Sequence, residues 1–543
     1  MQLYEYLLLL MMLIVFLQRK CWRLVWQVNG WRGIIQQPIL WILLICNIDP
    51  KNIMSSIHRY GRFMEVPLAI VLFDRILLYM DDPVSIEGVL TSPECLNKSF
   101  LHNGFYANKG ILHAKDEKWK IRRKQLNPAF SHNLLFNFFS DFNRVGNELS
   151  IKMKMELKQN HISFDNLADL VNRAVLEASC LTIMGVSTRF TQNDDKRIAG
   201  AYRYLMDLTA LKMLKPWYQI DSIFRLLDRQ KYDVTMKTGK LVDEFATNIV
   251  REKYSEWQKK RQENSDSYEN IEQNNEKHIF IEQLFHLADQ NKISSQEIMD
   301  EAQSMVVVSF ETASTCVINA LLLLAMYPKY QDKLRQEINE ILSLDKSSTN
   351  CSEINTTANN EHNTITTVHL QTMPYMDMIL KESLRLLTTV PIILRNVDKS
   401  FPLKIKNGKY KTKLVEVPKN TIIAGDIFNM HRSADVWGPK SLDFYPEHFA
   451  KDSNVESMQS ELKRHPYSYI PFLKGIRTCI GKLKGSRYSM YLAKVLLIKL
   501  IGSLNFCTST QLHELEFCEG VSLKYRNSKD IFFQVTSTAN AQK

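Results

Sequence analysis

The sequence of 543 residues has little of what disulfide-stapled or dinucleotide-binding proteins need. Its nine cysteines are odd in number, irregularly spaced and without a Cys-x-x-Cys pair, which indicates no disulfide framework and favours a reducing compartment. None of its 18 glycines forms a Gly-x-Gly-x-x-Gly loop, so we do not expect hydride chemistry on a bound dinucleotide. No collagen-like repeat is present, and the 45% of hydrophobic residues suffice for a large globular core.

The formal net charge of +11 is moderate for this length. It would suit nucleic acid, anionic lipid or an acidic protein partner. No nucleic-acid-binding motif is visible, so we expect no nucleic-acid partner and favour a membrane surface and a protein partner.

Long apolar runs are scarce, and the run at residues 7–17 (LLLLMMLIVFL) is shorter than the roughly 20 residues of a spanning helix. No basic segment precedes it and no small-residue cleavage site follows, which argues against a cleavable signal. Arg19, Lys20 and Arg23 follow the run and place the rest of the chain on the cytosolic side. We predict a membrane anchor over 1–23, a linker and membrane-proximal segment over 24–62, and one catalytic domain over 63–543. A buried core helix is the alternative for the run.

The remaining patterns predict individual helices, strands and loops. Ser294 and Glu297 form a capping box that opens a long helix ending near residue 325. Two polar stretches, 264–277 and 343–367, indicate surface loops. Strands are predicted at 63–81, 401–427 and 521–535, and helices at 118–124, 135–262, 376–387 and 482–500.

The chemistry centres on residues 471–481 (PFLKGIRTCIG) and on Cys479 within them. A cysteine binds a metal as its thiolate, which positive charge and N–H donors stabilise. Arg477 supplies a cation, Gly475 and Gly481 allow unusual backbone conformations, and the predicted helix from residue 482 points its positive end toward the sulfur. The pattern therefore indicates one anionic sulfur ligand on a large cofactor. For a lone cysteine, a buried apolar role would be the ordinary alternative.

Three further pairs carry chemistry. Trp119 and Arg123 are four residues apart and share one helix face, as do Glu382 and Arg385 at a spacing of three. An acid beside an alcohol in an apolar helix, Glu311 and Thr312, indicates a functional site, because an unpartnered buried carboxylate is costly. In the ordinary alternative, the Thr312 hydroxyl bonds to a backbone carbonyl and Glu311 finds a cation.

The spacing Phe-x-x-Gly-x-Arg-x-Cys-x-Gly over 472–481 resembles the haem-binding loop of the cytochrome P-450 superfamily of haem-thiolate monooxygenases. The resemblance implies a mainly α fold with small β-sheets, and it implies haem b with Cys479 as the axial iron ligand, flanked by Phe472 and Gly481. It also implies that the haem propionates are held by a further set of side chains: Trp119, Arg123, Arg395, His431 and Arg477.

The resemblance also assigns the pairs. Thr312 would direct protons to bound dioxygen and Glu311 would relay them, although Ser309 stands where the family usually has glycine. Glu382 and Arg385 would form a structural triad in which His448 replaces the usual arginine. Val308 occupies the position of a glutamate that becomes esterified to haem in some relatives, so we predict non-covalent haem. About four extra residues follow Gly481.

The implied reaction inserts one oxygen atom from dioxygen into an apolar substrate such as a fatty acid, a hormone-like lipid or a xenobiotic. Electrons would come from NADPH through a separate cytochrome P-450 reductase, with cytochrome b5 as a second donor, at the cytosolic face of the endoplasmic reticulum membrane. The resemblance is strongest to the insect-rich clan that includes fatty-acid ω-hydroxylases. A reductase-independent peroxide isomerase and a degenerate haem-binding protein stay open. An acidic flavoprotein would dock on a basic face made of Lys118, Lys120, Arg122, Lys124, Lys474, Lys482 and Lys484.

Overall fold

The computed structural model describes most of the chain between residues 20 and 538. The predicted membrane-spanning residues 1–19 lie outside this part, as do most of the polar stretch 264–277 and the segment 482–487. The ranges described are 20–30, 67–72, 75–106, 109–157, 160–188, 190, 195–264, 279–348, 364–408, 411–450, 464–481, 488–518 and 520–538.

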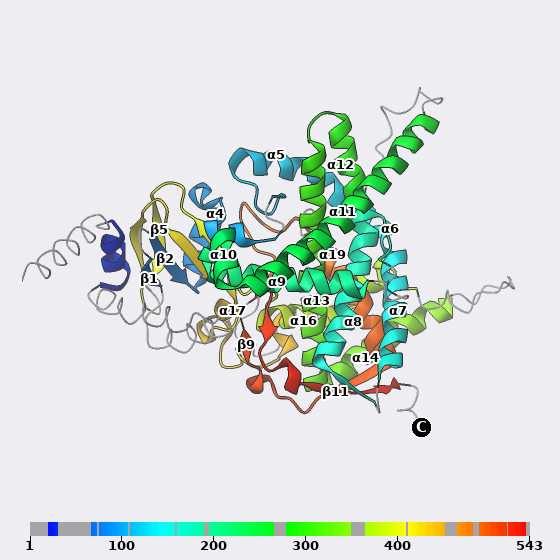
Figure 1. The fold of residues 1–543 in the computed structure, drawn as a ribbon. Coiled ribbons are helices and arrows are strands. Elements are labelled where there is room, and N and C mark those ends of the chain that lie inside the picture. The colour runs from blue at the N-terminus through cyan, green and yellow to red at the C-terminus, as the bar shows by residue number, and fades with distance from the viewer. Residues whose placement is uncertain are drawn as a thin grey trace, which may run out of the picture.

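Helices form the body of the molecule and surround the long helix α13, Ser295–Met326 (Figure 1). The Ser294 side chain caps α13 by accepting from the Glu297 N–H, and the Glu297 carboxylate accepts from the Ser294 N–H, as the capping box predicts. The other helices are α4 (Pro83–Thr91), α5 (Asp116–Leu126), α6 (His132–Asn137), α7 (Phe139–Glu156), α8 (Phe164–Ser179), α9 (Lys196–Leu214), α10 (Asp221–Leu227), α11 (Arg229–Asn264), α12 (Phe280–Asp289), α14 (Pro328–Ser348), α15 (Thr367–Gln371), α16 (Pro374–Leu386), α17 (Ile427–Met430), α18 (Ala434–Trp437) and α19 (Tyr488–Ser503).

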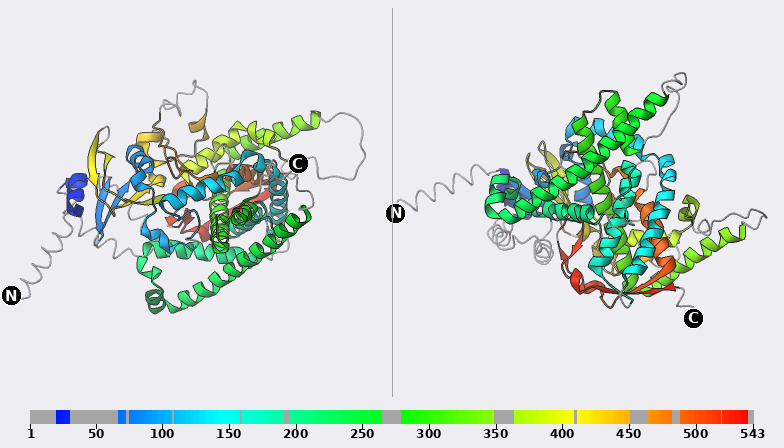
Figure 2. Two further views of the ribbon diagram at one scale, coloured as in Figure 1. Left: turned by 90° about the horizontal axis from the view of Figure 1, so that it is seen from above. Right: turned by 45° about the vertical axis from the view of Figure 1, so that its right-hand side comes forward.

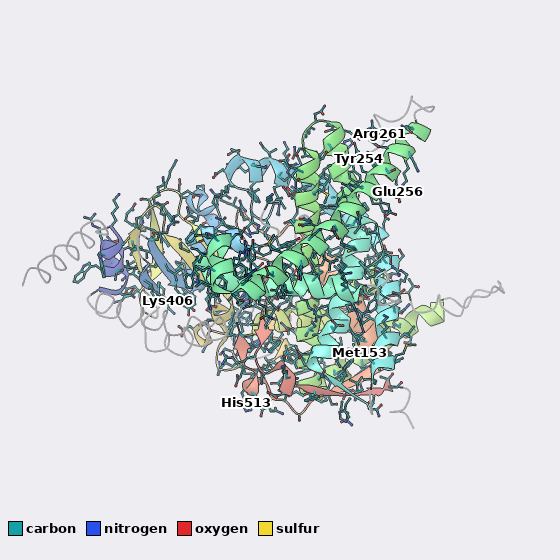
Figure 3. The ribbon with its side chains drawn as sticks, viewed as in Figure 1. Met153, Tyr254, Glu256, Arg261, Lys406 and His513 are labelled. Atoms are coloured by element: carbon teal, nitrogen blue, oxygen red, sulfur yellow. The ribbon has the colours of Figure 1, made fainter. Side chains whose placement is uncertain are left out.

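Helix α13 is the only helix of the described part that is long and apolar enough to cross a membrane. Its most apolar window is 83% buried, which identifies it as a core helix. It packs against α8, α16 and α19. Side chains fill the space between the helices, and Met153 of α7 is fully buried among them (Figure 3).

A small mixed sheet lies at one end of the helical body (Figure 1, Figure 2). Its strand order is β1-β2-β7-β4, with β2 parallel to β7 in the register Leu77↔Ile422 and the other pairs antiparallel. The predicted mainly α fold with small sheets is confirmed. The strands are β1 (Leu68–Leu72), β2 (Arg75–Met80), β3 (His161–Ser163), β4 (Ile392–Asn396), β5 (Phe401–Lys406), β6 (Thr412–Val417), β7 (Ile422–Asp426), β8 (Leu504–Cys507), β9 (Phe517–Cys518), β10 (Lys524–Tyr525) and β11 (Phe532–Ser537).

The helix over residues 20–30 changes the predicted domain boundary. Leu24 and Val25 are buried in the same apolar cluster as the strands. The Asn29 side chain donates to the Pro67 carbonyl and accepts from the Ala69 N–H. The part of the predicted 24–62 linker that is described therefore belongs to the globular domain, because its apolar side chains complete the core beside the sheet.

One predicted element end also moves. Helix α14 continues to Ser348, so the polar stretch predicted as a loop from residue 343 begins as helix. The described part of the helix predicted over 482–500 is α19, Tyr488–Ser503. Residues 482–487 lie outside the described residues, so the predicted effect of this helix on the sulfur stays a prediction.

Candidate active site

The loop that carries Cys479 turns back on itself and docks on the end of α4. The Cys479 N–H donates to the Phe472 carbonyl at 3.0 Å, and the Ile476 N–H donates to the Leu90 carbonyl at 3.2 Å. Gly475 has φ +79°, and a Cβ there would stand 2.1 Å from the Leu90 carbonyl oxygen. Glycine is therefore required at 475 by conformation and by space.

Gly481, the second glycine of the loop, does not need to be glycine for conformation or for space. A Cβ at Gly481 would lie 3.8 Å from the Cys479 Sγ, an ordinary contact, and its φ is not in the left-handed region. The Cys479 side chain itself is exposed. It stands at the surface of its loop, where a ligand can reach the sulfur.

Helix α5 brings Trp119 and Arg123 to this loop on one face, as their spacing predicts. Arg123 Nη2 donates to the Thr478 carbonyl at 2.9 Å. The Arg477 guanidinium lies 4.6 Å from the centre of the buried Trp119 ring. Burial lowers the pKa of Arg123, and the nearby Cys479 sulfur opposes that change. Arg123 therefore holds the backbone immediately before the cysteine, and Arg477, two residues before the cysteine, packs on the same helix.

A cluster of cations lies beside the loop. Burial lowers the pKa of Arg395 on β4 to about 10, and burial followed by repulsion from Arg395 lowers the pKa of Arg477 to about 9. The pKa of Lys98 is also well below its usual value, through burial and then repulsion from both arginines. None of the three forms an ion pair with any carboxylate in the described ranges.

Arg395 is buried and Lys98 and Arg477 are half-buried, and cations that are withdrawn from water and repel each other are costly unless an anion joins them. The cluster therefore fits a bound group with more than one negative charge, such as the two propionates of haem. Sequence analysis identified Arg395 and Arg477 but missed Lys98. No local pattern marks Lys98, because the fold alone brings it to residues about 300 and 380 positions away.

The centre of α13 places Glu311 and Thr312 in local hydrogen bonds. The Thr312 hydroxyl donates to the Val308 carbonyl at 2.9 Å, and the Ser309 hydroxyl donates to the Met305 carbonyl at 2.7 Å. The buried Glu311 carboxylate accepts from the Ser522 hydroxyl and lies 4.0 Å from the Lys524 Nζ. These are the bonds of the ordinary alternative, so the proton-transfer roles stay predictions.

The predicted structural triad is present. Arg385 and Glu382 are fully buried and joined by two bonds of 2.8 Å, and His448 Nδ1 lies 3.1 Å from Glu382 Oε1. Burial alone would raise the pKa of Glu382, but the bonds from Arg385 and His448 hold it below its usual value. Arg385 also donates to the carbonyls of His431, Ser441 and Asp443 and so ties three chain segments together.

His431 is fully buried within this structural region. Its Nε2 accepts from the Ile470 N–H at 2.9 Å, and its ring lies against Tyr469 at 5.3 Å. Burial, followed by repulsion from Arg385, lowers its pKa to about 3. These contacts support a structural role for the neutral ring, and its predicted contact with a propionate stays a prediction.

The predicted basic docking face is smaller than the sequence suggests. Arg122 is buried and pairs with Glu297 and Glu301 of α13, so it does not belong to the surface. Lys118 and Lys120 are exposed but form ion pairs with Glu297 and Glu117. Lys124 is exposed, Lys474 donates to a backbone carbonyl, and Lys482 and Lys484 lie outside the described residues.

Comparisons with known proteins agree with this geometry. The model of the family "Cytochrome P450" matches residues 36–506. The chain is 41% identical to "Probable cytochrome P450 318a1" of Drosophila melanogaster over 97% of this chain and 96% of that protein. It is 29% identical to "Probable cytochrome P450 313b1" of the same organism over 96% of each chain. It is also 26% identical to the mouse "Cytochrome P450 4V2" over 73% of this chain and 69% of that protein.

The resemblance predicted from the motifs, including the similarity to the insect-rich clan, is thereby confirmed. So is the enzyme class, because the family consists of oxidoreductases that bind haem b through a cysteine thiolate, typically without a covalent bond to the macrocycle. The exposed Cys479 side chain, the arginines Arg123 and Arg477 beside its loop, and the cluster of cations fit haem. The chain therefore belongs to the cytochrome P-450 family of haem-thiolate monooxygenases.

Proposed function

We propose that Cys479 is the axial haem ligand and that the enzyme inserts one oxygen atom from dioxygen into an apolar substrate. The observation that carries this assignment is the gathering of cations at the cysteine loop: Arg123 donates to the Thr478 carbonyl, and Arg477 of the loop lies near Arg395 and Lys98. When bound, the haem would supply the activation of dioxygen, and the thiolate would favour cleavage of the O–O bond.

Each remaining residue has a defined task in this proposal. Arg123, Arg395, Arg477 and Lys98 bind the propionates as charge-assisted donors, and Trp119 supports Arg477 through its ring. Phe472 fixes the cysteine by accepting its backbone N–H, and Gly481 leaves the sulfur accessible.

The Thr312 hydroxyl, which donates to the Val308 carbonyl, would direct protons toward dioxygen during the reaction. Glu311 would relay those protons, and its carboxylate is held by the Ser522 hydroxyl and lies 4.0 Å from the Lys524 Nζ. The side chain of Val308 packs on the core and offers no carboxyl group for esterification.

Electrons are proposed to come from a separate NADPH-dependent reductase, with cytochrome b5 as a second donor. The exposed Lys124 and the lysines at 482 and 484 would contribute to its docking face. The substrate class is an apolar molecule such as a fatty acid, a hormone-like lipid or a xenobiotic.

The endoplasmic reticulum membrane is the proposed location, with the catalytic domain on the cytosolic face. The predicted anchor over 1–23, of which residues 1–19 lie outside the described residues, would hold it there. The segment around α10 supports contact with lipid, because it exposes the apolar side chains of Trp217, Ile220, Leu226 and Leu227.

The decisive experiment is the spectrum of the reduced, CO-bound protein. We expect a thiolate-type Soret band that Cys479→Ser abolishes and that the control Cys507→Ser, on β8, leaves unchanged. A band of the imidazole type, or no haem, would support the degenerate protein. Product formation that needs NADPH and added reductase separates the monooxygenase from a peroxide isomerase, which would turn over hydroperoxides without either.

A further inference from the structure

A buried ion pair joins α5 to α13 at a distance from the reacting atoms. Arg122 Nη2 lies 3.0 Å from Glu297 Oε1, and Arg122 Nε lies 3.2 Å from Glu301 Oε1. The side chains of Arg122 and Glu301 are each only 5% exposed. Arg122 precedes Arg123 directly, so the pair fixes the helix that carries one of the two arginines next to Cys479.

The same carboxylate holds a second segment. Glu301 Oε2 accepts from the Ile111 N–H at 2.7 Å. A Cβ at Gly110 would stand 2.5 Å from the Ser304 Cβ, so this segment lies directly on α13. Further along, the carbonyls of Leu112 and Ala114 accept from Arg477.

Two paths therefore lead from Glu301 to the residues before the cysteine. One passes through Arg122 and α5 to Arg123 and the Thr478 carbonyl. The other passes through the backbone of residues 111–114 to Arg477. Both paths end one or two residues before Cys479.

We propose that Arg122 and Glu301 are positioning residues for the cysteine loop, whose buried pair seats α5 and residues 110–114 so that Arg123 and Arg477 hold the backbone at 477–478. The inference rests on the proposed role of Cys479 as the haem ligand. Removing a partner that bonds directly to a metal ligand changes metal affinity by about 10- to 100-fold, and residues that act through Arg123 and Arg477 should have an effect at or below the lower end of that range.

The energetics agree with a positional role. Burial raises the pKa of Glu301 to about 7, although the Ile111 N–H and Arg122 oppose that change. The fold therefore disfavours the ionised carboxylate that the pair needs. Because buried ion pairs often contribute little net stability, we attribute the role of this pair to the geometry that it imposes.

The test replaces the pair by apolar side chains, Arg122→Met with Glu301→Leu, because such double replacements of a buried pair are often tolerated. The rate of haem transfer to an excess of haem-free myoglobin is measured, together with the ratio of thiolate-type to shifted CO bands and the unfolding midpoint of the haem-free protein. We expect haem release up to about 10-fold faster, a larger shifted band, and an unfolding midpoint that does not fall.

A matched control removes another buried pair, Arg173→Met with Asp195→Leu, whose side chains are 1% and 0% exposed and whose Nη2–Oδ1 distance is 2.8 Å. We expect the control to release haem at the parent rate. Faster release of equal size in the control would overturn the proposal, because the effect would then be general loosening of the fold.

Glu301→Gln covers the case in which the double variant does not fold. Its amide oxygen can still accept from the Ile111 N–H, but it lacks the charge that binds Arg122. Haem release at the parent rate in this variant, with a normal thiolate-type band in the parent, would overturn the positioning role alone. A parent without that band would instead overturn the assignment of Cys479.

Discussion

Replacing Arg395 by glutamine should change the haem-free and haem-bound proteins in opposite directions. Arg395 is 4% exposed and donates only to the adjacent Leu394 carbonyl among the described groups. Burial of its charge therefore costs free energy that is recovered only when an anion binds beside it. Arg395→Gln should stabilise the haem-free protein and weaken its binding of haem.

The size of both effects follows from the structure. Burial lowers the pKa of Arg395 to about 10, roughly 2.5 below its ordinary value. At about 1.36 kcal/mol for each pKa unit, the buried charge costs about 3 kcal/mol at pH 7, where the side chain is protonated in both the folded and unfolded states. Loss of one charge-assisted hydrogen bond to a propionate costs about 1.5–3 kcal/mol, or roughly 10- to 100-fold in haem affinity.

Urea unfolding of the haem-free protein, followed by circular dichroism, measures the change in stability, and haem titration measures the change in haem affinity. Arg432→Gln is the matched control, because burial also lowers the pKa of Arg432 to about 10. Arg432 contacts the Leu386 carbonyl and the rings of Phe428 and Phe517, and it should leave haem affinity unchanged. A less stable haem-free Arg395→Gln protein with parental haem affinity would refute the reasoning.

Four further outcomes are expected. Gly475→Ala should lose haem-bound protein on expression and lower the unfolding midpoint, because its Cβ would meet the Leu90 carbonyl; parental haem content would contradict the required close approach. Acidified organic solvent should extract all haem from the parent, whereas Val308→Glu should retain a fraction on the chain, as mass spectrometry would show. Thr312→Ala should consume NADPH while releasing more peroxide per product, and parental coupling would exclude its role in proton delivery. Burial raises the pKa of Glu301 from 4.5 to about 7, although the Ile111 N–H, Arg122 and Lys118 oppose the change, so the folded protein binds this proton more tightly than the unfolded chain. The contribution of Glu301 should therefore lower the free energy of unfolding as the pH rises from about 4.5 to 7. Glu301→Gln should flatten that slope in urea unfolding measured across pH.

Local patterns predicted what depends on neighbours in the sequence. The capping box placed the start of α13, because its two bonds join residues three apart. The four-residue spacing of Trp119 and Arg123 put them on one face, and the three-residue spacing of Glu382 and Arg385 gave their pair. The motif around Cys479 led to the family, and the family comparison confirmed it.

Predictions of charge and of boundaries were weaker. Arg122 was assigned to a docking surface, yet it is buried, because only the packing of α5 against α13 decides which face of a basic helix is covered. The segment 24–30 was assigned to a linker, yet it completes the core beside the sheet. Helix α14 runs to Ser348, although the polar composition from residue 343 predicted a loop.

Local sequence was enough to predict Cys479 as the sulfur ligand, the glycine that its loop requires and the pairs spaced within one helical turn, because these depend on bonds and rotations between near neighbours. Tertiary structure alone decided that Lys98 joins Arg395 and Arg477, that Ser522 and Lys524 hold Glu311, and that Glu301 reaches both Arg122 and Ile111. Those contacts join residues that are far apart in the chain. Their energies depend on burial and on charge, which exist only once the chain has folded.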